Sequence, residues 1–333
     1  VEVDIEPLPA VTDAAEASKP GAPQLYDNIP NNVALDYHYG DTAKIEAAFA
    51  AAAHVTKLDI VNTRVAVVSM EPRVALAHYD KKTERFTLQV PTQGVSGNKA
   101  IMARLLNVPA DKVRILTGNV GGSFGMKNLS YPEYTCIAHA ARELGRPVKW
   151  LDERSTSFLS DSQGRAQLIH AELPLDAEGK FLAVRLSGYG NLGAYITGVA
   201  PGPLSLNTGK NLASVYRTPL LGVDIKTVLT NTTLMGAYRG AGRPEANYYM
   251  ERLTTRWASA ASPCASATSS SRRSCRSRRH QASPMTAAIS PACSRRRWRS
   301  PTTRTSPSAR RKAGRTASCA ASPSAPISKS PRR

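Results

Sequence analysis

Two stretches that follow each other in the chain decide the fold: "VRILTGNVGGSFGMK" (Val113–Lys127) and "YPEYTCIAHAARELGRPVKW" (Tyr131–Trp150). The first predicts a strand that runs into a glycine-rich turn. The second predicts a helix, because Pro132 falls in its first turn and Gly145 just past its end. A strand, a tight turn and a helix in direct succession indicate that strands and helices alternate in this chain.

The neighbouring sequence repeats this alternation. Helices are expected at Asp41–Val55, which is rich in alanine, and at Ser96–Pro109. Strands are expected at Arg85–Val90, where apolar and polar side chains alternate, and at Lys180–Ile196. We therefore predict a mixed α/β, or α+β, architecture for residues 1–253. Because the sequence opens directly with a strand-like segment, we expect these residues to be a fragment of a larger subunit.

Charge divides the chain sharply after residue 253. The formal net charge is +19, but residues 254–333 hold 16 Arg, 2 Lys and no Asp or Glu. Residues 1–253 hold 26 basic and 25 acidic side chains, which is typical of an ordinary globular protein. Cys136 is the one cysteine of this near-neutral part, which fits a reducing compartment such as the cytoplasm. The chain has no run of about 18 apolar residues, so we expect no membrane span.

Residues 254–333 contain no Leu, Val, Phe or Tyr, so we expect this tail to be disordered. An arginine- and serine-rich tail could bind nucleic acid, and a nucleic-acid-binding protein is therefore the alternative function. Our preferred interpretation is a frameshift near codon 253. Of the 80 tail residues, 73 have codons with C or G in the middle, as a GC-rich gene read out of frame would produce. On this interpretation we expect no nucleic-acid partner.

Three stretches before the tail could carry chemistry. "VGGSFGMK" (Val120–Lys127) would let the backbone approach a ligand and point N–H groups at anionic oxygens, although it matches no nucleotide-binding motif. "GAYRGAGRPEA" (Gly236–Ala246) offers two arginines that could bind oxyanions. "VPTQG" (Val90–Gly94) ends a strand with Gln93, whose amide can donate to an oxo group. Each stretch alone is also explained by an ordinary turn or strand end.

Together and in this order, the three stretches resemble the molybdenum-binding large subunit of the molybdenum hydroxylases. That family includes xanthine dehydrogenase, aldehyde oxidase and aerobic carbon monoxide dehydrogenase. The likeness covers essentially all of residues 1–253 and extends to "VSMEPR", "ELGRPVKW" and "NLGAYI". Three loops that match in order are far more specific than any one of them. The resemblance implies a fragment of a multi-domain α+β subunit.

The resemblance also implies a cofactor and partners. The family binds molybdopterin, commonly as the cytosine dinucleotide form in bacteria, with molybdenum. It oxidises a C–H bond of a small-molecule substrate with oxygen derived from water. Electrons leave through iron–sulfur clusters on a small subunit and FAD on a medium subunit. A glutamate from the distant C-terminal region acts as the base, and we expect the present chain to be inactive because that region lies beyond residue 253.

Site residues are carried over one by one. Gln93 would donate a hydrogen bond to an oxo ligand of molybdenum, so that Gln93, Phe124 and Arg239 form the molybdenum environment without ligating the metal. The backbones of the glycine-rich turn and of the arginine loop would lie against the cofactor through Gly122, Phe124, Gly125, Arg239 and Gly240.

Departures from the family pattern narrow the substrate. Purine-oxidising members have a Glu just after the glycine-rich turn and an aromatic residue two positions after the loop arginine, where this chain has Asn128 and Ala241. A purine would lose a charge-assisted hydrogen bond and a stacking face. Members that oxidise carbon monoxide have a copper-binding Cys directly after the arginine, where this chain has Gly240. The resemblance therefore favours an aldehyde or an N-heteroaromatic substrate.

Overall fold

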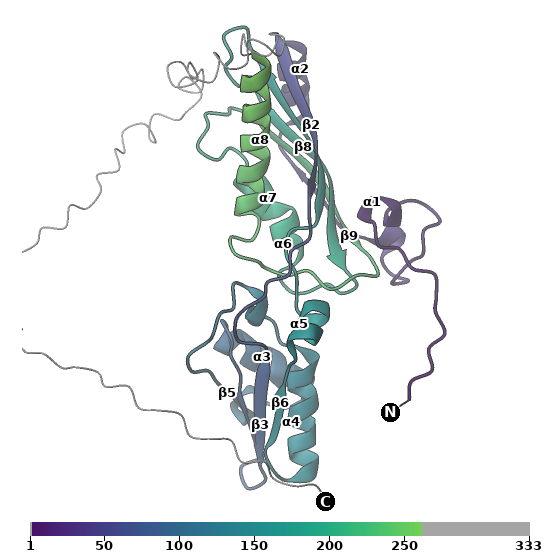
Figure 1. Cartoon of the computed structure of the whole chain (residues 1–333), viewed down its shortest axis with the longest axis vertical. Helices are drawn as coiled ribbons and strands as arrows, with labels where there is room; N and C mark the ends of the chain where they lie inside the picture. Colours follow the sequence, from purple (N-terminus) through teal and green to yellow (C-terminus); the bar gives the residue numbers. More distant parts are fainter. Residues whose placement is uncertain (1, 262–333) are drawn as a thin grey trace, which may run out of the picture. The chain divides into compact units, whose positions relative to one another are not determined.

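Two β-sheets with helices packed on them make up the part of the chain that the computed structural model describes, residues 2–261 (Figure 1). The larger sheet has the order β1-β9-β8-β7-β2, with strands β1 (Val33–Tyr39), β2 (His54–Asn62), β7 (Gln167–Leu175), β8 (Val184–Gly193) and β9 (Leu221–Leu229). The smaller sheet has the order β5-β4-β3-β6, with strands β3 (Val74–Asp80), β4 (Arg85–Gln89), β5 (Val113–Leu116) and β6 (Val148–Leu151). Each sheet contains one parallel pair among antiparallel ones, so the predicted mixed α/β architecture is confirmed.

Helices connect the strands of both sheets. They are α1 (Ala14–Ala17), η1 (Pro30–Asn32), α2 (Thr42–Ala50), α3 (Val95–Leu105), η2 (Ala110–Lys112), η3 (Met126–Asn128), α4 (Pro132–Leu144), α5 (Arg154–Ser160), α6 (Pro201–Leu204), α7 (Leu206–Lys210) and α8 (Arg243–Ala261). The helix expected over residues 41–55 is shorter than predicted: Asp41 caps α2 through a 3.1 Å bond from the Lys44 amide, and the helix ends at Ala50. Strand β2 begins at His54, because residues from His54 onward pair with β7 and cannot continue the helix.

The larger sheet owes its stability to apolar side chains that β7, β8 and β9 bury against α8. Tyr249, Met250 and Leu253 of α8 are completely buried in this core. Strand β8 needs glycine at one point: Gly188 has a φ of +149°, and a Cβ there would lie 2.0 Å from the carbonyl oxygen of Leu168 on β7. The close pairing of β7 and β8 therefore excludes a side chain at this position.

The smaller sheet packs against α4, the helix predicted from the opening stretch. Tyr134, Ala138 and Ala141 of α4 are buried against the core of this sheet, which includes Phe86. The helix ends as predicted, because Gly145 adopts a left-handed φ of +65° at its C-terminus. Local sequence signals are thus sufficient to place this helix.

Helix α8 continues past the boundary expected after Leu253. Residues 254–261 extend it, and Thr254 and Trp257 are buried on its inner face. The indole ring of Trp257 meets Phe181 edge to face, with ring centroids 6.1 Å apart. The start of the basic tail therefore belongs to the folded part of the chain. The predicted disorder, frameshift and nucleic-acid contact of the remaining tail concern residues 262–333, which lie outside the described residues.

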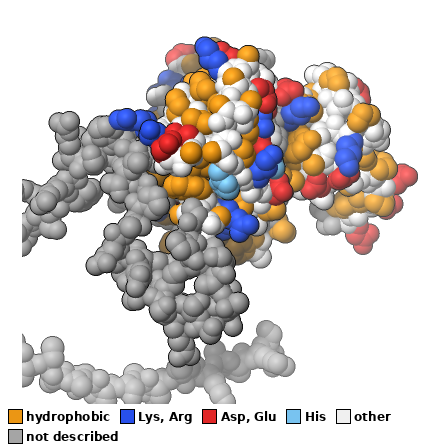
Figure 2. All heavy atoms as spheres, turned by 90° about the horizontal axis from the view of Figure 1, so that it is seen from above, with side chains coloured by type: hydrophobic (Ala, Val, Ile, Leu, Met, Phe, Trp, Pro, Cys, Tyr) orange, Lys and Arg blue, Asp and Glu red, His pale blue; other side chains and the backbone are white. Residues whose placement is uncertain are grey.

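Acidic and basic side chains are interspersed with apolar ones on the face that Figure 2 shows. This mixture agrees with the nearly balanced charge of residues 1–253. Within the described part of the chain, no helix is both long and apolar enough to cross a bilayer.

We predict that Trp257→Ala destabilises the folded chain by about 3 kcal/mol, because it removes a large buried ring from the core of the larger sheet. Urea unfolding followed by circular dichroism measures this loss. Arg256→Ala, at the exposed neighbouring position, is the matched control and should change the unfolding free energy by less than about 0.5 kcal/mol. Equal midpoints for the two variants would show that α8 does not depend on residues beyond 253.

Candidate functional site

The glycine-rich turn between β5 and α4 adopts a backbone that glycine makes possible. Phe124 and Gly125 both have positive φ, at +51° and +107°. A Cβ on Gly125 would lie 2.1 Å from the carbonyl oxygen of Ala237, so only glycine fits there. The turn is thereby pressed against the loop that contains Ala237.

That second loop is the arginine-rich stretch between β9 and α8. The backbone N–H of Arg239 donates to the carbonyl oxygen of Phe124 at 2.8 Å. The guanidinium carbon of Arg239 lies 5.6 Å from the centroid of the Phe124 ring, which is within the range of a cation–π interaction. Both side chains are exposed, so an aromatic face and a positive charge lie side by side at the surface.

Gln93 joins this arrangement from the loop between β4 and α3; the strand expected to end with Gln93 ends earlier, at Gln89. Its carbonyl oxygen Oε1 accepts hydrogen bonds from the Ser123 hydroxyl at 2.5 Å and from the Gly125 amide at 2.8 Å. Because the oxygen of the amide faces the turn, the Nε2 group points away from it. Gln93 is exposed and can present these N–H donors to a ligand.

The other predicted site residues lie around these three. Gly122 leaves room for the Phe124 ring, which a Cβ would approach to 3.1 Å. Asn128 lies beside Gly94, since a Cβ there would come within 2.8 Å of the Asn128 Oδ1 atom. Gly240 has a φ of +96° in the arginine loop. The carbonyl oxygen of Ala241 accepts a 2.9 Å bond from Asn207, which holds it to α7. Gln93 bonds to Gly125 and Arg239 bonds to Phe124, so the structure brings these four residues together. Asn128 adjoins them, because its backbone amide donates to the Gly125 carbonyl at 3.2 Å, whereas Ala241 is held by Asn207.

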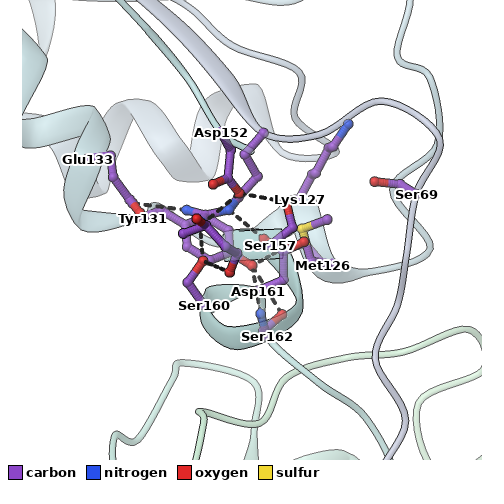
Figure 3. A network of polar contacts seen from close by, with 12 residues as sticks. Ser69, Met126, Lys127, Tyr131, Glu133, Asp152, Ser157, Ser160, Asp161 and Ser162 are labelled. Atoms are coloured by element: carbon purple, nitrogen blue, oxygen red, sulfur yellow. Dashed lines mark hydrogen bonds and ion pairs between the residues drawn. The ribbon is translucent and has the colours of Figure 1, made fainter. Parts of the chain in front are cut away.

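A buried cluster of charges beneath the turn was not predicted from the sequence (Figure 3). Its centre is Arg73, whose side chain is fully buried and contacts Asp161 at 2.6 Å and Glu133 at 2.9 Å. Its guanidinium also lies 4.0 Å from the centroid of the Tyr131 ring. Burial by itself lowers the pKa of Arg73, but the neighbouring carboxylates outweigh it and raise the pKa. The arginine therefore stays charged.

A second buried cation, Lys127, closes the glycine-rich turn. Its Nζ atom lies 2.7 Å from the carboxylate of Glu71 and 2.9 Å from the backbone oxygen of the same residue. Glu71 also accepts a 2.9 Å bond from the Gly121 amide. Burial raises the pKa of Glu71, but the hydrogen bonds from Lys127 and Gly121 outweigh it and lower the pKa. The only sequence signal for this support was the quoted "VSMEPR", to which no role was assigned.

The backbone of the arginine loop (Gly236–Ala246) is held by hydrogen bonds from Arg165. The Arg165 guanidinium donates to the carboxylate of Glu245 at 2.8 Å and to the backbone oxygens of Tyr238 and Arg239 at 3.1 and 3.2 Å. Glu245 also accepts from the Gly242 amide at 2.9 Å, which caps the start of α8. These bonds fix the loop backbone and leave the Arg239 side chain exposed.

The exposed side of this site consists of hydrogen-bond donors and an aromatic ring. Gln93 and Arg239 suit a ligand that presents oxygen atoms or negative charge, and Phe124 offers a flat apolar wall. Within residues 2–261, no group of His, Cys, Asp and Glu side chains is placed to hold a metal ion. A hollow of about 500 Å³ on one face of the larger sheet includes Asp59, His170 and Asp224 in its lining, and none of the predicted site residues lines it.

Comparisons with known proteins identify the family to which these loops belong. The family described as the molybdopterin cofactor-binding domain matches residues 25–262. The 6-hydroxypseudooxynicotine dehydrogenase complex subunit gamma of Paenarthrobacter nicotinovorans is 36% identical over 254 residues, which are 76% of this chain and 31% of that protein.

Solved structures agree with this assignment. Reconstituted CO dehydrogenase from Oligotropha carboxidovorans superposes with a TM-score of 0.73 at 28% identity, over 78% of this chain and 34% of the other. Quinoline 2-oxidoreductase from Pseudomonas putida 86 superposes with a TM-score of 0.71 at 30% identity, over 77% of this chain and 33% of the other. The chain thus spans about a third of the length of the relatives that it matches.

We predict that Glu71→Gln destabilises the fold by about 3 kcal/mol at neutral pH, because it leaves the fully buried Lys127 without its counter-charge. The pKa of Glu71 is lower in the folded chain, so its stabilising effect is complete above the ordinary value of 4.5 and is lost as the pH falls through the lower folded pKa. The variant should lack this acid-dependent loss.

Urea unfolding between pH 3.5 and 7 measures both effects. Glu84→Gln is the control, because Glu84 is exposed and lies 3.6 Å from Lys112 in a surface ion pair. The idea fails if the two variants have the same stability at pH 7.

Proposed function

The chain belongs to the molybdopterin cofactor-binding domain family of molybdenum-containing oxidoreductases, and on that premise we propose that its described residues form one wall of the cofactor site in a molybdenum hydroxylase large subunit. The observation that carries the proposal is the contact between two loops, in which the Arg239 amide donates to the Phe124 carbonyl at 2.8 Å. This contact gathers Gln93, Phe124 and Arg239 on one exposed surface. When bound there, a molybdopterin cofactor supplies the metal at which a substrate C–H bond is oxidised with oxygen derived from water.

The donors of this surface fit an oxygen-rich, anionic cofactor. Gln93 would donate from Nε2 to an oxo group, because its Oε1 atom is already bonded to Ser123 and Gly125. Arg239 would balance negative charge at the cofactor edge, and the Phe124 ring would keep water from that side. We propose the cytosine dinucleotide form of the cofactor, following the resemblance to bacterial members. Gly122, Gly125 and Gly240 would allow the backbone to approach it.

The resemblance places the general base in a distant glutamate, and we assign that role to none of the described residues. Because the chain spans about a third of its relatives, we propose that other parts of a longer subunit complete the site. On this proposal the present chain alone is inactive. Iron–sulfur clusters on a small subunit and FAD on a medium subunit would carry the electrons away. The name of the relative from Paenarthrobacter, a complex subunit gamma, supports an assembly of several subunits, and we place that assembly in the cytoplasm.

For the substrate we propose an aldehyde or an N-heteroaromatic ring. Asn128 and Ala241 offer neither the carboxylate nor the aromatic clamp that the resemblance associates with purines. Gly240 replaces the copper-binding cysteine of the carbon monoxide-oxidising members. The similarity to a quinoline 2-oxidoreductase supports the N-heteroaromatic choice, since quinoline is such a ring.

We predict that Gln93→Ala and Arg239→Ala each lower the turnover of the complete cofactor-loaded enzyme by about 100-fold, because each removes one preorganised donor at the metal edge. Steady-state kinetics with an artificial electron acceptor, normalised to molybdenum content, measures the effect. Arg252→Ala is the control, because Arg252 is exposed further along α8 and its guanidinium carbon lies 5.8 Å from the centroid of the Tyr248 ring. Full turnover per molybdenum in either site variant would refute these two assignments.

We also predict that the enzyme prefers quinoline or a simple aromatic aldehyde to hypoxanthine by about 100-fold in kcat/KM, because a purine would find no partner for its polar edge. Assays of the three compounds side by side test this. Asn128→Glu should narrow the gap by restoring the carboxylate, and with it the charge-assisted hydrogen bond, that the resemblance associates with purines. A wild-type enzyme that favours hypoxanthine would overturn the substrate proposal and leave the cofactor proposal intact.

A further inference from the structure

We infer that Ser123 orients the Gln93 side chain so that the amide nitrogen, rather than the amide oxygen, faces the cofactor. The inference rests on the proposed function and assigns to Ser123 the role of a positioning residue. Ser123 lies in the middle of the glycine-rich turn and is only 7% exposed. Its hydroxyl is therefore shielded from water and bonds to Lys127 in the turn and to Gln93 outside it.

The hydroxyl acts as a hydrogen-bond donor toward Gln93. Its oxygen accepts a hydrogen bond from the backbone N–H of Lys127 at 3.1 Å. Its single proton is then free for Gln93, which it reaches at 2.5 Å. A hydroxyl that donates needs an acceptor, and the acceptor of a glutamine amide is Oε1. The Lys127 amide thus occupies one lone pair of the Ser123 oxygen, and the hydroxyl proton is directed to Oε1 of Gln93.

The Gly125 amide strengthens this choice. It donates to the same Oε1 atom at 2.8 Å, and a backbone N–H can only donate. Rotating the Gln93 amide by 180° would place its NH₂ group against the Gly125 N–H and would remove that hydrogen bond, while Ser123 would change from donor to acceptor. The Gly125 amide therefore selects the orientation, and the Ser123 hydroxyl adds a second donor to it. With Oε1 held by two donors, Nε2 is directed to the exposed side of the turn.

Orientation matters because the two ends of the amide act oppositely on an oxo group. The Nε2 group donates to it, whereas Oε1 would repel it. Without the Ser123 hydroxyl, the Gly125 amide alone would hold Gln93 in place. A glycine or alanine at position 123 would therefore leave the fold of the turn but weaken the orientation of its neighbour.

The first test uses the 333-residue chain without cofactor. The chain has six glutamines, so labelling their side-chain nitrogens with ¹⁵N gives few NMR signals, and Gln93→Ala identifies that of Gln93. We expect a high heteronuclear NOE for this amide in the wild type and in Ser123→Thr, which keeps the hydroxyl. In Ser123→Ala the NOE should fall while the other five glutamines are unchanged. An ordered Gln93 amide in Ser123→Ala would overturn the inference.

The second test is a double-mutant cycle in the complete cofactor-loaded enzyme. Ser123→Ala should lower turnover per molybdenum by about fivefold, the usual effect of one lost hydrogen bond, and should have no effect in the Gln93→Ala background. Ser69→Ala is the matched control. Ser69 is also buried beside the turn but donates to the Glu71 backbone, so its effect should be the same in both backgrounds.

The outcomes separate the two claims. If Gln93→Ala lowers turnover and Ser123→Ala lowers it equally in both backgrounds, the orienting role of Ser123 is wrong and the cofactor site stands. If Gln93→Ala has no effect on turnover, the proposed function of Gln93 is wrong, whatever the NMR experiment shows.

Discussion

The hydrogen bond from the Arg239 amide to the Phe124 carbonyl is the interaction on which the candidate site depends. It joins the glycine-rich turn, which follows strand β5 of the smaller sheet, to the arginine loop, which follows strand β9 of the larger sheet. The two backbones can approach only because Gly125 has no side chain, since a Cβ would lie 2.1 Å from the Ala237 carbonyl oxygen. The two sheets thus contribute to one surface, and neither loop would form that surface by itself.

Buried charges support the glycine-rich turn and the start of α4 that follows it, because Lys127 lies in the turn and Arg73 contacts Tyr131 and Glu133. Arg73 and Lys127 are both fully buried, and each is neutralised by carboxylates. Burying two cations is costly, and an apolar core of the same volume would often be at least as stable. The ion pairs instead fix the positions of specific residues. Glu71 accepts hydrogen bonds from both the Lys127 side chain and the Gly121 backbone, so it connects the two ends of the glycine-rich turn.

Local patterns were sufficient for part of the fold. Pro132 and Gly145 correctly marked the ends of α4. The approach of the glycine-rich turn to a ligand stays a prediction, and within the protein Gly125 of this turn lies against the Ala237 backbone. The errors arose where contacts between distant residues override local helix propensity. Helix α2 ends earlier than predicted because β2 pairs with β7, which lies more than a hundred residues later in the chain. Helix α8 continues into the basic tail because the larger sheet supplies a partner for Trp257.

The difference between local patterns and long-range contacts also explains which site residues could be predicted from the sequence. Gln93, Phe124 and Arg239 could be predicted from sequence motifs, because each lies in a short loop whose residues resemble the family pattern. Arg73 was missed because its partners Glu133 and Asp161 are 60 and 88 residues away in the chain. Such pairs become visible only when the sheet is assembled. The role we propose for Ser123 was not predicted for a related reason, since its acceptor Gln93 lies in another loop, 30 residues away in the chain.

Burial distinguishes the polar residues that stabilise the fold from those that we propose to bind the cofactor. Arg73, Lys127 and Glu245 are buried, and their hydrogen bonds are required to offset the loss of water. Gln93 and Arg239 are exposed, and water could satisfy their donors equally well. The fold nevertheless fixes the Oε1 atom of Gln93 with two bonds and the backbone of Arg239 with two more. Orienting exposed donors in this way contributes little to stability, and it is the arrangement expected of a surface that binds an oxygen-rich ligand.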